Sequence, residues 1–385
     1  MSLVFPDLDE LRGRTSAKWR TYGTEVIPAF VAEMDVALAE PVQDALLGAV
    51  RRSDTGYRWT AGLGEALADF AQERWGWRLD PGAVFALPDV LTCLEQSILV
   101  LTEPGDGVVI NSPVYPPFWS TVRDITGRTL VDVPLARDDD GRYRLDVDAM
   151  REAFARPEVR AWVLCSPHNP TGSVPTRAEL AALGAAALEH GVAVIADEIH
   201  APLTHPGVVH TPFIPVAPDG LVAVSLVSAS KAWNLAGLKC AQVVAANDDV
   251  ARRLRAGIAM ERSFATGHLG VVAAIAAYRE GVPWLDEACA WLASNGARIG
   301  EVVADRLPQV RYVPPSASYL AWLDANALGL GADPSAVVLH RASVALSPGR
   351  SFGPNGAGFM RLNFGTSPQL LDVILDRLVD ALEVR

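Results

Sequence analysis

Residues 226–240, with the sequence LVSASKAWNLAGLKC, bring Lys231 to the end of an apolar run, next to Ser228 and Ser230. Burial at such a place lowers the pKa of a lysine, and a neutral amine can form a Schiff base with an aldehyde. The two hydroxyl groups and a second cation, Lys239, suit a phosphate group. The segment therefore predicts a site for an aldehyde cofactor that carries a phosphate.

Polar side chains also follow two other apolar runs. Asp197 lies in VIADEIH (194–200), and Asn169 lies in LCSPHNPTG (164–172). A buried carboxylate is costly without a cationic partner. A protonated pyridine nitrogen would be such a partner, and an asparagine can donate to a ring hydroxyl. Each residue alone is more often structural, but together with Lys231 they predict a pyridoxal phosphate site.

The elements that must position these residues alternate along the middle of the chain. One helix is predicted over residues 176–190, with Thr176 as N-cap and Glu179 at capping-box spacing. Valine-rich runs predict strands at GDGVVINS (105–112), RAWVLCSP (160–167), GVAVIADE (191–198) and LVAVSLVS (221–228). This rhythm predicts an α/β fold with a mostly parallel sheet covered on both faces. Ligands of such sheets bind at the carboxyl ends of the strands, where the candidate residues lie.

The pattern changes from about residue 285. Residues 284–307 predict a long helix, and SYLAWLDA (318–325) predicts a strand. We expect a large cofactor-binding domain over 44–280 and a smaller α+β domain over 281–385. The N-terminal segment 1–43 is expected to pack with the smaller domain.

The composition limits the partners. The net charge of −12 over 385 residues argues against binding to nucleic acid or anionic membranes. No apolar run reaches the roughly 18–20 residues that a membrane span needs, and the N-terminus lacks a signal-peptide pattern. The four cysteines form no CxxC pair, and the seven histidines lack metal-site spacing. We expect a cytoplasmic protein without a metal, acting on a small molecule.

In eight segments between about residues 28 and 370 the chain resembles the class I/II aminotransferase superfamily, pyridoxal phosphate enzymes of fold type I. Within it, the chain is most similar to the MalY/PatB branch of cystathionine β-lyases, or C–S lyases. The segments are FVAEMD, GYRWTAGL, SPVYPPF, LCSPHNPTG, VIADEIHAPLTHPGVVHTPF, SASKAWNLAGLKCA, SYLAWLDANALGL and FMRLNFGTS. The resemblance implies a mostly parallel, seven-stranded central sheet and a smaller α+β C-terminal domain.

The resemblance also implies roles around the cofactor ring. Lys231 matches the lysine that holds the cofactor and moves the proton at the substrate's α-carbon. Asp197 matches the carboxylate that keeps the pyridine nitrogen protonated, and Asn169 the donor to the phenolic oxygen. Tyr115 matches the aromatic side chain that stacks on the ring. His200 stands where many relatives have a tyrosine, and it could make the same hydrogen bond.

Further matches concern the phosphate and the partner subunit. Ser228 and Lys239 match phosphate ligands. The backbone N–H groups of Val90 and Leu91, at the start of the predicted helix VLTCLEQSILVL, are expected to meet the phosphate as well. Tyr57 matches a tyrosine that reaches the neighbouring subunit's phosphate, which implies a homodimer with shared active sites.

The substrate end of the site depends on Arg361. It matches the arginine that grips the substrate's α-carboxylate as a bidentate fork, beside Asn169 and Tyr115. Asp89 departs from the family pattern, because an acid there would repel the phosphate unless it points away. Trp233 is bulkier than the expected aromatic residue, and we expect it to narrow the pocket.

Three functions remain open from the sequence. The branch resemblance favours α,β-elimination from L-cystathionine or another S-substituted L-cysteine. An aminotransferase would use the same residues, and no residue separates the two reactions. A regulatory protein that keeps the cofactor but acts through a protein partner is the third possibility.

Overall fold

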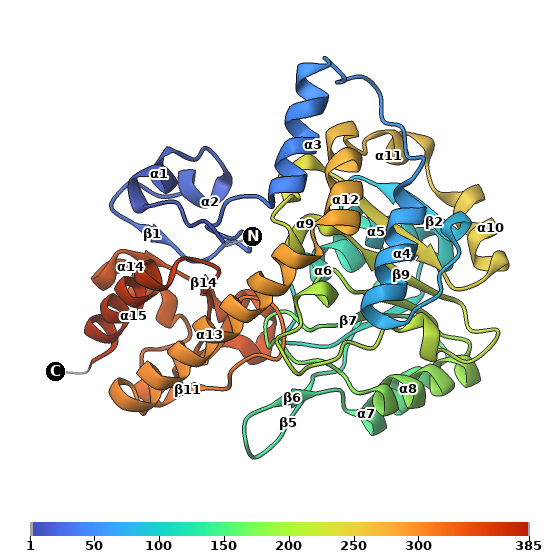
Figure 1. The fold of residues 1–385 in the computed structure, drawn as a ribbon. Helices are drawn as coiled ribbons and strands as arrows, with labels where there is room; N and C mark the ends of the chain where they lie inside the picture. The colour runs from blue at the N-terminus through green and yellow to red at the C-terminus, as the bar shows by residue number, and fades with distance from the viewer. Residues whose placement is uncertain (1–2, 384–385) are drawn as a thin grey trace.

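A seven-stranded central sheet forms the core of the protein (Figure 1), in a computed structural model that describes residues 3–383. Its strands, in spatial order, are β2 (Val84–Leu87), β10 (Ala241–Ala245), β9 (Ala223–Val227), β8 (Ala193–Asp197), β7 (Val159–Cys165), β3 (Gly107–Ile110) and β4 (Thr129–Asp132). Strands β9, β8, β7, β3 and β4 run parallel, whereas β10 is antiparallel to both β9 and β2. The predicted α/β class and the mostly parallel sheet are therefore confirmed.

Helices cover both faces of the central sheet because successive side chains of a buried strand point to opposite sides. Val163 of β7 packs into a core cluster with Leu94 and Ile98 of α5 (Val90–Leu101). Trp162 packs in a different cluster, which includes Phe154. That cluster is covered by α7 (Val147–Phe154) and α8 (Arg177–His190).

The local start signals of the helices act as the sequence predicts. Thr176 caps α8: its hydroxyl accepts from the backbone N–H of Glu179 at 3.2 Å, and its own N–H donates to the Glu179 carboxylate at 2.7 Å. The long helix α13 covers Val282–Arg306. The other helices are α1 (Leu8–Gly13), α2 (Ala17–Arg20), α3 (Glu40–Arg51), α4 (Leu63–Trp75), α6 (Pro117–Ser120), α9 (Ala229–Ala232), α10 (Asp248–Gly257), α11 (Met260–Phe264), α12 (His268–Glu280), α14 (Pro334–Ala342) and α15 (Pro368–Leu382).

A second, C-terminal sheet lies beside the central one. Its order is β11 (Arg311–Tyr312), β12 (Leu320–Asp324), β15 (Phe359–Asn363) and β14 (Ser347–Pro348), all antiparallel. Trp322 is paired with Arg361, and Asp324 with Phe359, so these four side chains share one face of the sheet.

The N-terminal segment contacts the C-terminal part of the chain. Strand β1 (Ile27–Pro28) pairs in parallel with β13 (Val344–Ala345). Figure 1 shows α1, α2 and β1 beside α14 and β14, away from α7 and α8. The boundaries 1–43, 44–280 and 281–385 stay a prediction.

A small hairpin, β5 (Ala136–Arg137) with β6 (Tyr143–Arg144), projects toward the C-terminal sheet. All four cysteines are buried and unpaired. No helix within residues 3–383 is both long and apolar enough to cross a membrane.

Candidate active site

A cavity of about 430 Å³ opens at the carboxyl ends of β7 and β8, facing the C-terminal sheet. It brings together all the predicted site residues except Ser228 and Tyr57. The residues gathered there are Val90, Leu91, Tyr115, Asn169, Asp197, His200, Ser230, Lys231, Lys239 and Arg361. Segments more than 250 residues apart in the sequence thus meet in one place.

Lys231 lies in the short helix α9, which begins directly after β9. Its Nζ atom donates to the carbonyl oxygen of Ala32 at 2.9 Å. Burial, and then the nearby charge of Arg361, lower the pKa of Lys231 to about 8. A neutral amine is therefore accessible near neutral pH, as a nucleophilic or proton-accepting lysine requires.

Asp197 is the last residue of β8 and is almost completely buried. Its Oδ1 atom accepts the backbone N–H of Ile199 at 3.1 Å, and no cation among the described residues lies within ion-pair distance. Burial raises the pKa of Asp197 to about 7. A carboxylate in such a place needs a cationic partner, and the protonated nitrogen of a pyridine ring fits this need.

Arg361 on β15 is also buried, and its guanidinium lies 4.9 Å from the centroid of the Phe352 ring. Nη1 donates to Asn169 Oδ1 at 3.0 Å, and Nη2 donates to the Phe30 carbonyl at 2.7 Å and to Ser347 Oγ at 3.1 Å. Nε has no partner within residues 3–383. Burial lowers the pKa of Arg361 to about 10. The group is thus a cation without a carboxylate, suited to an anionic part of the substrate.

The side chains around the expected ring position stay uncharged. Burial, and then the charges of Lys231 and Arg361, lower the pKa of His200 to about 3. Its Nδ1 atom is 3.0 Å from Ser318 Oγ, which leaves Nε2 for another partner. Burial raises the pKa of Tyr115 above its usual value, so its phenol stays protonated. The Asn169 amide accepts from Arg361 through Oδ1, so its NH₂ group remains able to donate.

The opposite end of the cavity is the N-terminus of α5. Val90 and Leu91 are its first residues, and backbone N–H groups at this place have no partner within the helix. Asp89 caps the helix by accepting from the backbone N–H and the hydroxyl of Thr92, at 2.8 and 2.9 Å. Its second oxygen accepts from Lys239 Nζ at 2.9 Å. This end of the cavity therefore offers N–H donors and a lysine, which fits a phosphate group.

Asp89 is not an unpaired acid at the expected phosphate site, because it is bonded to Thr92 and Lys239. Burial alone would raise its pKa, but the hydrogen bonds from Thr92 and Lys239 bring the pKa below its usual value. Its charge is thus shared with Lys239. A phosphate bound here would have to share Lys239 with Asp89.

Two predicted cofactor ligands lie outside the cavity. The Ser228 hydroxyl donates to the Cys240 carbonyl at 2.7 Å and accepts from the Ser230 N–H at 3.1 Å, so it caps α9. The Tyr57 side chain is 94% exposed. Both roles stay predictions.

The expectation that Trp233 narrows the pocket is wrong. Its side chain is completely buried in the core, where it makes edge contacts with Phe70 and Tyr278. Its indole N–H donates to the Gly281 carbonyl at 3.0 Å. Trp233, two residues after Lys231, therefore points away from the cavity, and its large side chain packs in the core.

Part of the site comes from the N-terminal segment, which sequence reasoning did not place there. Phe30, Val31 and Ala32 line the cavity. The carbonyls of Phe30 and Ala32 accept from Arg361 and Lys231. Every residue has a backbone carbonyl, so the sequence does not show which carbonyls act as acceptors in the site. Only the family-like segment FVAEMD could have indicated this contribution.

The family model for aminotransferase class I and II matches residues 35–378. The chain belongs to this family. It is 36% identical to cystathionine beta-lyase PatB of Bacillus subtilis, over 98% of this chain and 99% of the relative. It is 30% identical to protein MalY of Escherichia coli, over 94% and 93% of the two chains.

Solved structures agree with this assignment. A candidate PLP-dependent beta-cystathionase from Corynebacterium diphtheriae superimposes with a TM-score of 0.93 at 33% identity, covering 100% of both chains. The predicted resemblance to the MalY/PatB branch, the fold type I architecture and pyridoxal phosphate as cofactor are therefore confirmed.

Proposed function

We propose that this protein is a pyridoxal phosphate-dependent carbon–sulfur β-lyase. With one molecule of water, it converts L-cystathionine or a related S-substituted L-cysteine into a thiol, pyruvate and ammonia. The observation that carries this proposal is the full-length similarity to cystathionine beta-lyase PatB, at 36% identity. The arrangement of Lys231, Asp197 and Arg361 around one cavity supports it.

The chain's own residues can perform the proton transfers that the reaction needs. Arg361 and the Asn169 amide hold the substrate's α-carboxylate, which fixes the α-carbon beside Lys231. When bound, pyridoxal phosphate supplies an electron sink for the charge that develops at the α-carbon. Lys231 Nζ takes the α-proton, and Asp197 holds the proton of the pyridine nitrogen. The ammonium of Lys231 can then return a proton to the sulfur that leaves the β-carbon.

The test is an incubation of the cofactor-loaded protein with L-cystathionine and no keto acid. Pyruvate and free thiol are followed together with the visible absorbance of the cofactor. Sustained, equimolar production of pyruvate and thiol is the expected result. A single equivalent of keto acid per active site, with an aminated cofactor and no thiol, would instead identify an aminotransferase. No turnover with any S-substituted cysteine would refute the lyase.

We also propose that the protein is a homodimer in which Tyr57 completes the partner's phosphate site. Several large apolar side chains are exposed in this part of the chain. Arg58 donates to the Ser263 carbonyl of α11 at 2.7 Å, which places Tyr57 and Trp59 beside α11. The exposed side chains are Leu47, Val50, Tyr57, Trp59, Met260 and Phe264. Patches of this kind on soluble proteins are typical of interfaces. The unpaired buried cysteines support a reducing compartment, such as the cytoplasm.

Shared sites can be tested by mixing two variants that are each impaired in a different part of the site. Lys231→Ala lacks the catalytic lysine, and Tyr57→Phe lacks the hydroxyl offered to the partner. Unfolding and refolding the two together should yield hybrid dimers in which one site is intact, so part of the activity returns. Recovery absent from hybrids of confirmed dimeric mass would refute the shared site.

A further inference from the structure

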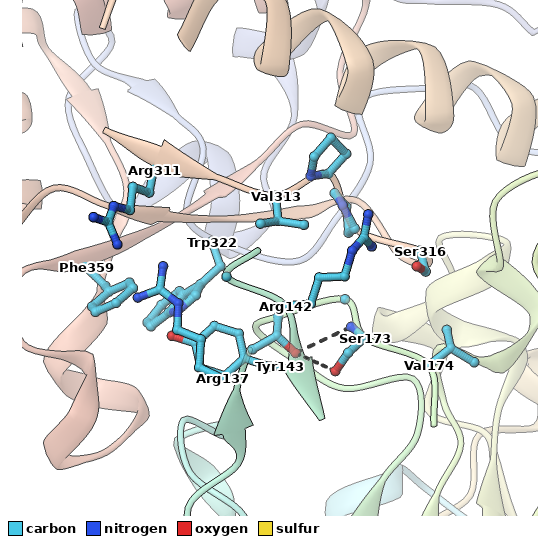
Figure 2. A pocket seen from close by; sticks show the side chains of 15 residues that line it. Arg137, Arg142, Tyr143, Ser173, Val174, Arg311, Val313, Ser316, Trp322 and Phe359 are labelled. Atoms are coloured by element: carbon cyan, nitrogen blue, oxygen red, sulfur yellow. Dashed lines mark hydrogen bonds between the residues drawn. The ribbon is translucent and has the colours of Figure 1, made fainter. Parts of the chain in front are cut away.

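A second cavity, of about 140 Å³, lies between the β5–β6 hairpin and the C-terminal sheet (Figure 2). Three arginines line it, Arg137 and Arg142 from the hairpin and Arg311 from β11. No carboxylate is among its lining residues, and it shares no residue with the candidate active site. We call this cavity the arginine cleft.

Arg137 is held in a fixed orientation. Its guanidinium lies 5.5 Å from the Tyr143 ring centroid and 5.6 Å from that of Phe359. Nη1 donates to Asp324 Oδ2 at 2.9 Å. The edge with Nε and Nη2 faces Gly141, where an added Cβ would lie 3.5 Å from Nη2. A guanidinium stacked and bonded in this way loses little freedom when it binds an oxyanion.

Among residues 3–383, neither Arg142 nor Arg311 has an acidic partner of its own, because Asp324, the cross-strand neighbour of Arg311, pairs with Arg137. Within the described residues neither guanidinium has a hydrogen bond or an ion pair, and both side chains are exposed. In the hairpin, Asp138 pairs with Arg144 at 3.2 Å and accepts only the backbone N–H from Arg142. Two free guanidinium groups thus border a cavity that already contains an ordered third one.

The remaining wall supplies hydroxyl groups. Thr171, Ser173 and Ser316 line the cleft, and the first two are hydrogen-bonded to each other at 2.8 Å. The Ser316 N–H donates to the Gly172 carbonyl at 3.0 Å, which joins this turn to the segment after β11. Hydroxyl and guanidinium groups together commonly donate hydrogen bonds to phosphate and carboxylate oxygens in proteins.

We propose that the arginine cleft binds a small oxyanion, a phosphate- or carboxylate-bearing metabolite, at a site separate from the catalytic one. Such a ligand would bridge the hairpin and the C-terminal sheet. The cleft is connected to the active site at two places. Thr171 follows Asn169 by two residues, and Trp322 in the floor of the cleft is paired with Arg361 across the sheet. Occupancy would therefore restrain the two residues that hold the substrate. The proposal does not depend on which reaction the enzyme catalyses.

The test is isothermal titration of the cofactor-loaded enzyme with inorganic phosphate at constant ionic strength. The bound cofactor keeps the catalytic phosphate cradle filled. Arg142→Gln and Arg311→Gln should each weaken phosphate binding about tenfold or more, the loss expected for one charge-assisted hydrogen bond. Arg151→Gln, at an exposed position of α7 outside the cleft, is the matched control and should bind like the wild type.

A parallel titration with succinate separates the two classes of oxyanion. Succinate binding that Arg142→Gln weakens would assign carboxylates to the cleft, and phosphate binding weakened alone would assign phosphates. If neither anion binds the wild type, or if all four proteins bind equally, the proposal is refuted. Unchanged circular dichroism of the variants excludes misfolding as the cause of a loss.

Discussion

The catalytic cavity and the arginine cleft both lie against the C-terminal sheet, yet they treat charge in opposite ways. In the catalytic cavity burial shifts the pKa values of Lys231, Asp197 and His200 toward their neutral forms. In the cleft the arginines Arg142 and Arg311 are exposed and remain cations. The first environment prepares groups to exchange protons, whereas the second can only attract and hold an anion. Buried lysine, aspartate and histidine thus suit a site for proton transfer, whereas arginine, buried as Arg361 or exposed as in the cleft, suits the binding of an anion.

The largest effect is expected at Lys231. Lys231→Ala removes the amine that holds the cofactor and moves the α-proton, so kcat should fall by at least ~10²–10⁴-fold. The visible absorbance of the cofactor should change at the same time. Addition of methylamine should restore part of the rate, because a small amine can enter the space left by the side chain. Activity that persists without any added amine would contradict the assignment.

Asp197→Asn should have the next largest effect. A buried charge without its partner costs about 3–5 kcal/mol, so cofactor retention should fall by roughly 10²- to 4 × 10³-fold. Equilibrium dialysis of the variant against graded concentrations of pyridoxal phosphate measures this directly. Equal retention by wild type and variant would mean that Asp197 does not contact the ring nitrogen.

In the cofactor-free protein, the raised pKa of Asp197 should make the free energy of unfolding depend on pH. A carboxyl whose folded pKa of about 7 exceeds its ordinary value of 3.8 contributes stability below pH 4 that is lost as the pH rises through 7. The free energy of unfolding of wild type minus that of Asp197→Asn should therefore fall by up to ~4 kcal/mol between pH 4 and 7. Taking the difference cancels the opposite contribution of buried histidines such as His200. Parallel stability curves would show that burial does not act on Asp197 in this way.

Arg361→Lys should have an intermediate effect. Lysine keeps the charge but loses the fork, so kcat/KM should fall by about 10–100-fold, mainly through KM. Arg298→Lys provides the control, because that arginine is half exposed and pairs with Asp372 at the surface. A fall in kcat with unchanged KM would argue that Arg361 supports the site without binding the substrate.

The smallest effect on catalysis is expected in the cleft. Arg142→Gln should leave the rate of thiol release within about twofold of wild type in buffer free of phosphate and carboxylates, since surface substitutions away from a site are nearly neutral. The same assay repeated with added phosphate shows whether occupancy of the cleft alters KM. A large loss of the rate of thiol release in anion-free buffer would show that the cleft contributes to catalysis even without a ligand. The contrast between the two cavities would then not hold.

The sequence predicted those parts of the site that follow from local pattern. Asp197, Asn169 and Lys231 could be found because polar residues at the ends of buried parallel strands meet at one edge of a sheet. The helix start at Val90 and the cap at Thr176 are local signals of the same kind. Strand β10, which is antiparallel to β9, was not among the predicted strands.

Other features depend on contacts between distant segments. The carbonyls of Phe30 and Ala32 act in the cavity through backbone atoms that every residue possesses. Arg137 and Arg311 are 174 positions apart, and only the packing of the hairpin on the C-terminal sheet brings them together. Trp233 was misplaced because its neighbour Lys231 faces the cavity, and a single turn of helix sends the two side chains in different directions.

The pairing of β1 with β13 has a consequence for the order of events during synthesis. Residues 27–28 leave the ribosome long before their partners at 344–345, which are made 317 residues later. Until then the Phe30 carbonyl and the Arg361 guanidinium, which bond at 2.7 Å in the finished protein, cannot meet. Competence to bind the substrate is therefore acquired only after Arg361 has emerged, so chains that end before it should not consume amino acids.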